Sequence, residues 1–223
     1  AVDAMHRCMA NIASSSEHAR PHLLRRWVIG GVVVLLALLV ISLVTSYNRL
    51  VTLDQGVQGT WADVENNYQR RADLVPNLVN TVRGAAAFEA DTLLAVTEAR
   101  ARVTQATAAS PTTSAESFAK YQQAQDALSS SLARLSVVVE RYPDLRATQN
   151  FRDLQSQLEG TENRIAVARM RFNEASQAFN AKRSSFPTVL MASIMSHRFH
   201  TKLYFAAAPG AQTVPSVNFG SNK

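Results

Sequence analysis

The chain has 223 residues and a formal net charge of +6, and glycine (8) and proline (7) are scarce. This composition argues against a β-rich or disordered chain and favours long helices. The single cysteine, Cys8, excludes an intrachain disulfide and a C-x-x-C motif. Arginines alternate with acidic residues and form no long run of positive charge, so no nucleic-acid partner is expected.

The first predicted element is a transmembrane helix at residues 27–45, which follows an N-terminal tail at residues 1–26. Its apolar stretch, WVIGGVVVLLALLVISLV, contains no charged residue. Eighteen helical residues span about 27 Å, close to the ~30 Å of a bilayer's hydrocarbon core. Trp27 and Tyr47 flank the stretch as aromatic anchors. A cleaved signal peptide is the alternative, which the length of the run and the absence of a small-x-small cleavage site disfavour.

The charges on the two sides of this helix predict its orientation. Arg7, Arg20, Arg25 and Arg26 precede it, whereas Arg49 is the only basic residue among the twenty that follow. The positive-inside rule therefore predicts a cytoplasmic N-terminus and places the rest of the chain on the opposite side of the membrane.

Residues 46–187 are predicted to form a helical bundle, because apolar residues recur at alternating spacings of three and four. Such a period buries one stripe of each helix against nearly parallel neighbours, as in a coiled coil. The seam of the first helix consists of Tyr47, Leu50, Asp54, Val57, Trp61, Val64 and Tyr68. Only Asp54 interrupts its apolar character. Similar seams run from Phe118 to Tyr142 and from Phe151 to Phe179.

The expected boundaries give four helices, at residues 46–72, 74–108, 114–141 and 145–184, followed by a C-terminal tail at residues 188–223. Pro111 and Pro143 mark two of the breaks. Gly84 and the polar residues 89–91 mark a point where the second helix could bend. Because the connections are short, neighbouring helices should be antiparallel. The predicted fold is therefore all-α, an N-terminal transmembrane helix followed by an up-and-down four-helix bundle.

The remaining break is predicted within RRADLVPNL, residues 70–78. Asp73 can cap a new helix that begins at Leu74, which places Pro76 in the first turn, where its missing N–H breaks no hydrogen bond. The alternative is one continuous helix kinked at Pro76.

Candidate catalytic and metal sites are few. His197 and His200 form an H-x-x-H pair, but no acidic residue follows them to complete a metal site. The alternative is a basic surface turn that faces lipid headgroups, since Arg198 and Lys202 lie beside the histidines. The predicted bundle has no histidine, no nucleophile motif and no glycine-rich phosphate loop. We therefore expect no enzymatic activity, no cofactor and no metal.

A candidate partner surface is suggested by polar side chains in two segments of the predicted bundle. Its members are Arg70, Arg71, Asp73, Asn150, Asn163, Arg164 and Arg169. The alternative is a solvated face with pairs at i,i+3 and i,i+4, such as Glu159 with Asn163, each contributing about 0.3–0.5 kcal/mol.

Several segments resemble the LemA family. They are YNRLV at residues 47–51, RRADLVPNLVNTVRG at 70–84, TEAR at 97–100 and the long stretch at 142–187. The resemblance implies a bacterial membrane-anchored helical protein whose molecular activity is not settled, and it supplies no catalytic residues. One relative takes part in magnetosome formation, which implies a role in organising membranes. The family has also been discussed with its N-terminus outside, whereas the arginines of this sequence favour a cytoplasmic N-terminus.

The predicted function is that of a non-enzymatic scaffold anchored in a bacterial inner membrane through residues 27–45. Its expected partner is another membrane protein or a second copy of itself. The alternative is a ligand-binding or sensing bundle that holds lipid or peptide between its helices. A closed core would favour the scaffold, and a sizeable apolar cavity would favour ligand binding.

Overall fold

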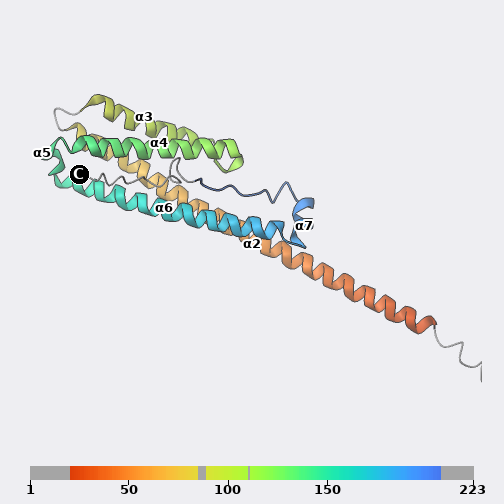
Figure 1. The fold of residues 1–223 in the computed structure, drawn as a ribbon. Helices are drawn as coiled ribbons and strands as arrows, with labels where there is room; N and C mark the ends of the chain where they lie inside the picture. The colour runs from red at the N-terminus through yellow and green to blue at the C-terminus, as the bar shows by residue number, and fades with distance from the viewer. Residues whose placement is uncertain (1–20, 85–88, 110, 207–223) are drawn as a thin grey trace, which may run out of the picture. The chain divides into compact units, whose positions relative to one another are not determined.

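The computed structural model describes residues 21–84, 89–109 and 111–206, which form helices, turns and irregular segments without any strand (Figure 1). The elements are α2 (Pro21–Arg83), α3 (Ala90–Ala108), the 3₁₀ helix η1 (Pro111–Thr113), α4 (Ala115–Val139), α5 (Pro143–Arg146), α6 (Gln149–Ser184) and α7 (Thr188–Ile194). The predicted all-α class is confirmed. The chain divides into two compact units, Ala1–Arg49 and Leu50–Lys223, and α2 extends across their boundary.

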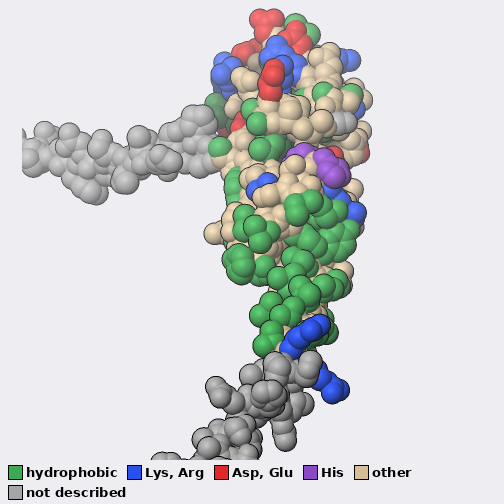
Figure 2. All heavy atoms as spheres, turned by 90° about the vertical axis from the view of Figure 1, so that its right-hand side faces the viewer, with side chains coloured by type: hydrophobic (Ala, Val, Ile, Leu, Met, Phe, Trp, Pro, Cys, Tyr) green, Lys and Arg blue, Asp and Glu red, His purple; other side chains and the backbone are tan. Residues whose placement is uncertain are grey.

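The first unit contains the predicted membrane span. Every side chain from Arg25 to Ile41 is exposed, and Trp27 is 80% exposed. Figure 2 shows hydrophobic side chains over this segment, with basic side chains next to the grey atoms at its N-terminal end. Among the described residues, this is the one helix that is long and apolar enough to cross a membrane. A bare apolar helix of this length is stable in a bilayer, because lipid can cover it where water would not.

The predicted helix junction at Asp73 is wrong, because α2 continues through Pro76 to Arg83. Asp73 is an exposed residue inside the helix and accepts a hydrogen bond from Gln69 Nε2 at 2.7 Å. An internal proline costs about 3 kcal/mol. The turns around Pro76 bury four side chains that offset this cost: Val75, Leu78, Val79 and Val82. Helix α2 ends at Arg83, and the next helix, α3, begins at Ala90.

The core of the second unit is drawn from α2, α3, α4, α5 and α6. One cluster of buried residues joins Val75, Leu78, Val79, Val82, Leu93, Val96, Ala99, Val103, Leu128, Leu135, Val139, Leu145 and Phe151. The predicted seams are buried as expected for Leu50, Val57, Val64 and Tyr68 of α2. Asp54, the polar interruption in that seam, forms an ion pair with Lys202 Nζ at 2.5 Å.

The two proline breaks after α3 are confirmed, with helix boundaries shifted by a few residues. Ser114 caps α4 and exchanges hydrogen bonds with Ser117 in a capping box. Pro143 opens the short α5, and α6 then begins after Thr148, whose hydroxyl accepts a hydrogen bond from the Phe151 N–H. These local signals end one long helix and start the next.

Part of the expected C-terminal tail packs against the helices. Residues 188–194 form α7, and residues 195–206, named here the strap, continue without regular structure. Thr188, Ala192, Phe199 and Phe205 are buried. Residues 207–223 of the expected tail lie outside the described residues, as do Arg7, Cys8 and Arg20 at the other end.

Candidate functional site

The guanidinium of Arg71 lies in the middle of the second unit and links three helices. It donates from Nη1 to Glu162 Oε2 of α6 at 2.8 Å and to Ser129 Oγ of α4 at 2.5 Å. It donates from Nη2 to Gln125, reaching Oε1 at 2.6 Å and the main-chain oxygen at 3.2 Å. It also lies over the Tyr68 ring, 5.1 Å from its centroid. Arg71 itself is 1% exposed, whereas the side chain of Glu162 is 53% exposed.

This network is polar but incompletely satisfied. Arg71 Nε, Gln125 Nε2 and Tyr68 Oη are buried without a hydrogen-bond partner. Burial raises the pKa of the Tyr68 phenol and that of the neighbouring Tyr121 phenol above the ordinary 10.0, because a phenolate would lose its hydration there. A guanidinium stays protonated and cannot accept a hydrogen bond. The hydrogen bonds of Arg71 therefore hold α2 against α4 and α6.

The structure contradicts one member of the predicted partner surface, Arg71, which is buried. It occupies a seam position, three residues after Tyr68, so the fold turns it toward α4 and α6. Arg70 and Asp73 of the same helix are exposed. Sequence reasoning missed Gln125 and Ser129 as its partners, although Gln125 lies in a predicted seam and a polar residue there could have indicated a polar core contact.

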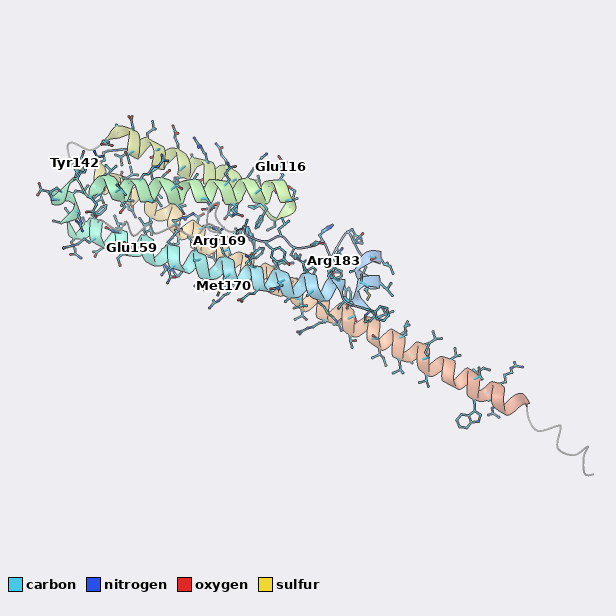
Figure 3. All side chains as sticks on the ribbon, in the orientation of Figure 1. Glu116, Tyr142, Glu159, Arg169, Met170 and Arg183 are labelled. Atoms are coloured by element: carbon cyan, nitrogen blue, oxygen red, sulfur yellow. The ribbon has the colours of Figure 1, made fainter. Side chains whose placement is uncertain are left out.

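The predicted members on α6 lie in different surroundings. Asn150, Asn163 and Arg164 are exposed, and Arg164 donates to Thr161 Oγ1 one turn earlier. Arg169, labelled in Figure 3, instead touches the strap: its guanidinium lies 4.6 Å from the Phe205 ring centroid and donates to the Ala206 oxygen at 3.3 Å. The exposed members remain a predicted partner surface, which consists of Arg70, Asp73, Asn150, Asn163 and Arg164.

Two asparagines on α6 hold the strap. Asn173 accepts from the Phe205 N–H at 2.8 Å and donates to the Phe205 oxygen at 3.1 Å. Asn180 does the same with Lys202, at 2.8 and 2.9 Å. Seven helical residues advance about 10.5 Å, and three extended residues advance about 10 Å, so the two spacings match. Each side-chain amide thus pairs with the strap backbone as a neighbouring strand would.

The strap also completes an aromatic cluster. The Trp61 ring lies 6.0 Å from that of Phe205, 5.8 Å from Phe118 and 5.3 Å from Phe172, measured between centroids. These rings come from α2, α4, α6 and the strap. Aromatic pairs at such separations contribute about 0.5–1.5 kcal/mol beyond the area they bury.

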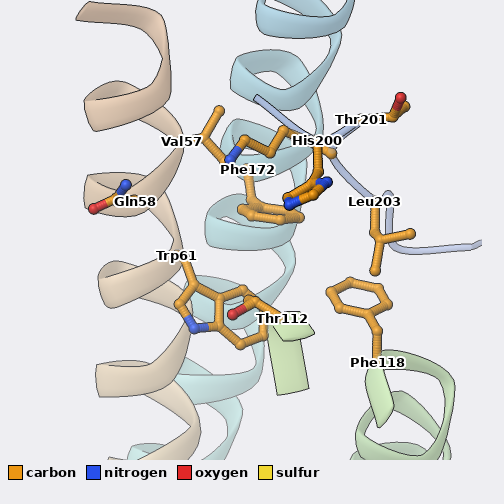
Figure 4. A pocket seen from close by; sticks show the side chains of 10 residues that line it. Val57, Gln58, Trp61, Thr112, Phe118, Phe172, His200, Thr201 and Leu203 are labelled. Carbon is orange, nitrogen blue, oxygen red and sulfur yellow. The ribbon is translucent and has the colours of Figure 1, made fainter. Parts of the chain in front are cut away.

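Beside this cluster lies a pocket of about 450 Å³. Figure 4 shows Trp61, Phe118 and Phe172 reaching it from three helices, with His200 and Leu203 approaching from the strap. The residues that line it are Val57, Gln58, Trp61, Thr112, Phe118, Phe172, His200, Thr201, Lys202 and Leu203. An apolar floor with a few polar groups at the rim is suited to an apolar group of a small ligand or peptide.

The H-x-x-H pair does not lie on a helix, because residues 195–198 form turns after α7 and His200 belongs to the strap. The two histidines therefore lack the i,i+3 geometry of a helical pair. The described residues contain no group of three or more His, Cys, Asp or Glu side chains suited to a metal ion.

Comparisons with known proteins agree with the resemblance seen in the motifs. Residues 60–219 match the model of the LemA family. The chain is 26% identical over 189 residues to the magnetosome proteins MamQ 1 and MamQ 2 of Paramagnetospirillum magneticum, covering 77% of this chain and 69% of each relative. It is 27% identical over 213 residues to the magnetosome protein MamQ of Magnetospirillum gryphiswaldense, covering 85% of this chain and 78% of the relative.

Proposed function

Because the chain belongs to the LemA family, we propose that it is a single-pass protein of a bacterial inner membrane that acts as a non-enzymatic scaffold or interaction partner. The observation that carries this proposal is the fully exposed apolar stretch of α2, which continues in the same helix into a unit with its own buried hydrophobic core. The relatives named magnetosome proteins support an association with membranes.

The proposed architecture of the second unit is an up-and-down bundle of α3, α4, α6 and the part of α2 after Leu50. The contacts between α2 and α6 support opposite directions for these two helices. Arg71 meets Glu162, Trp61 meets Phe172, and Asp54 lies with Lys202 beside Phe179. Each step toward the N-terminus of α2 is matched by an equal step toward the C-terminus of α6. Such a bundle presents its polar outer faces to a partner while its apolar stripes pack against one another.

The partner is sought through the exposed face of α6. A photo-crosslinking residue placed at Asn163 or Arg164 should yield a discrete adduct with a membrane protein or a second copy of this chain. The same residue at Gln123, an exposed position on α4 outside the predicted surface, is the matched control. A chain that stays in the membrane fraction without any adduct at the α6 positions would contradict the interaction role.

Self-association through the span is tested separately. Gly30 and Gly31 form a small-residue patch on which an added Cβ meets nothing within 4 Å, so Gly31→Leu fits the isolated helix. If two spans pack through this patch, Gly31→Leu should reduce the crosslinked dimer without changing the helical content measured by circular dichroism. Unchanged crosslinked species would exclude packing at this patch.

The pocket beside Trp61 supports a second candidate function, the binding of an apolar ligand. Native mass spectrometry of the protein extracted with its lipids should then show a bound small molecule. Thr112→Trp would fill the pocket from an exposed position and abolish that species, whereas Thr113→Trp, one residue further along η1 and outside the lining, should retain it. A ligand-free wild-type protein would reject this function.

A further inference from the structure

Helix α7 presents an unusual apolar face. Phe186 is 79% exposed, Leu190 is 56% exposed and Ile194 is 82% exposed, with Val189 beside them at 38%. On its other side Thr188 and Ala192 are buried. The helix therefore packs through its small side chains and turns its large apolar ones outward, which costs free energy in water.

The chain around α7 carries only positive charge. No acidic residue occurs between Ala175 and Ala206, whereas Lys182, Arg183, Arg198 and Lys202 do. Lys202 is neutralised by Asp54, and Arg183 donates to the Phe199 oxygen. Segments that lie in the interface of an anionic bilayer have this composition, a short apolar helix flanked by basic residues.

The position of α7 along the second unit agrees with this composition. The equal steps of α2 and α6 bring Phe179 level with Asp54, and four further residues bring Arg183 level with the start of the unit at Leu50. α7 follows directly after α6. The predicted span ends at residue 45, and five residues of helix cover only about 7.5 Å. The apolar face thus lies at the end of the unit to which the span is joined.

We propose that Phe186 and α7 form a second contact with the bilayer, in the leaflet on the side of the bundle. Phe186, Leu190 and Ile194 insert among the lipids at the headgroup boundary, and the exposed Arg198, which follows α7, meets anionic headgroups. This inference rests on the proposed membrane anchoring, because it needs the span to bring α7 to the surface. The contact would fix the orientation of the second unit on the membrane surface.

The test uses the full chain in a Cys8→Ser background, reconstituted in liposomes of phosphatidylcholine with or without phosphatidylglycerol. A polarity-sensitive fluorophore is attached to a cysteine at Leu190, and the control label sits at Val137, a 71% exposed apolar residue near the far end of α4. The Leu190 label should emit at shorter wavelength and lose intensity with lipids brominated on their acyl chains. The Val137 label should do neither, and the shift at Leu190 should be larger with phosphatidylglycerol.

Two outcomes would overturn the proposal. If the Leu190 label behaves like the Val137 label, the apolar face of α7 is exposed to water and does not contact the bilayer. A shifted emission without quenching by brominated lipid shows that protein, and not the bilayer, covers α7. Flotation of the liposomes after an alkaline wash distinguishes failure of the α7 contact from failure of the membrane anchor. Protein that floats but is not quenched rejects only the α7 contact, and protein that is washed away rejects the membrane anchor as well.

Discussion

At the scale of single residues, the most consequential position is Arg71. A buried guanidinium with a half-exposed carboxylate partner recovers less than its full desolvation cost, so such a pair is a weak source of net stability. Removing one member is nevertheless costly, because the buried groups that bonded to it lose their partner. Arg71 therefore specifies how α2 meets α4 and α6 more than it adds to the free energy of unfolding.

We predict that Arg71→Ala lowers the free energy of unfolding by about 1–3 kcal/mol, the cost of leaving a buried polar group without its partner. The loss combines a cavity with an unpaired Oε1 on Gln125, whereas Ser129 Oγ still donates to Glu162 Oε1. Arg71→Met should cost less, because it refills the volume with apolar atoms. Arg70→Ala is the control, since Arg70 is exposed in the adjacent position and its loss should stay within about 0.5 kcal/mol. Chemical denaturation in detergent measures all three, and equal losses for Arg70 and Arg71 would contradict the buried network.

The buried phenols of Tyr68 and Tyr121 make a prediction about pH. Burial raises both pKa values above 10.0, so above pH ~10 the folded chain retains protons that the unfolded chain releases. Stability should therefore be unaffected by these groups below pH ~10 and fall above it, by up to about 1.4 kcal/mol per pH unit for each phenol.

The Tyr68→Phe variant tests the cause of that slope. It removes an unpartnered hydroxyl, so stability at neutral pH should be unchanged or slightly higher while the alkaline loss becomes shallower. Denaturation midpoints from about pH 8 to 11 provide the measurement. Identical alkaline slopes in wild type and Tyr68→Phe would rule out this phenol as a source.

At the scale of elements, the strap shows how side-chain amides can pair with the backbone of an irregular segment. The amides of Asn173 and Asn180 each supply one donor and one acceptor to the strap backbone. Without them the main-chain groups at Lys202 and Phe205 would be partly buried without partners, which chains avoid. The aromatic contact of Phe205 with Trp61 then stabilises the same segment from its other side.

We predict that Asn173→Ala and Asn180→Ala each reduce stability by about 1–3 kcal/mol, because each leaves a donor and an acceptor of the strap without a partner. Hydrogen exchange should show the faster exchange first at the amides of Lys202 and Phe205. Asn163→Ala, on the exposed face of α6, is the matched control and should change neither quantity. Unchanged exchange at the strap in both variants would show that the amides do not hold it.

The continuity of α2 makes a prediction for Asp73. Since this residue lies inside a helix and caps nothing, Asp73→Ala should not cost the ~1 kcal/mol of a lost N-cap. Alanine has the higher helix propensity, so the thermal midpoint should be unchanged or slightly raised. A clear fall of the midpoint would restore a helix start at this position.

At the scale of the whole molecule, the proposed topology is tested through Cys8, the only cysteine of the chain. If the N-terminus is cytoplasmic, a membrane-impermeant maleimide should label Cys8 only after the cells are broken. A Cys8→Ser variant with Val137→Cys should give the opposite result, since residue 137 belongs to the second unit. Labelling of Cys8 in intact cells would reverse the orientation that the arginines predict.

The sequence by itself determined the helical class, the apolar span and the buried stripes, because a 3-4 periodicity and an uncharged run are local properties that survive any tertiary arrangement. It also contained more than we predicted: the seam of the first helix continues past Tyr68 through Arg71, Val75, Leu78 and Val82. The predicted junction at Asp73 ended the seam too early and left Arg71 on the surface. Only packing energy decided that Pro76 stays inside a helix, since local propensity alone favours a break there.

Tertiary structure alone decided which distant groups meet. Glu162 reaches Arg71 across 91 positions of sequence, and Gln122 reaches Ala206 across 84, separations at which no local pattern operates. The strap has neither helical nor alternating periodicity, so its composition resembled a tail. It becomes ordered because α6 happens to offer two asparagine amides at a spacing that an extended chain can match, and that match exists only once α6 has folded beside it.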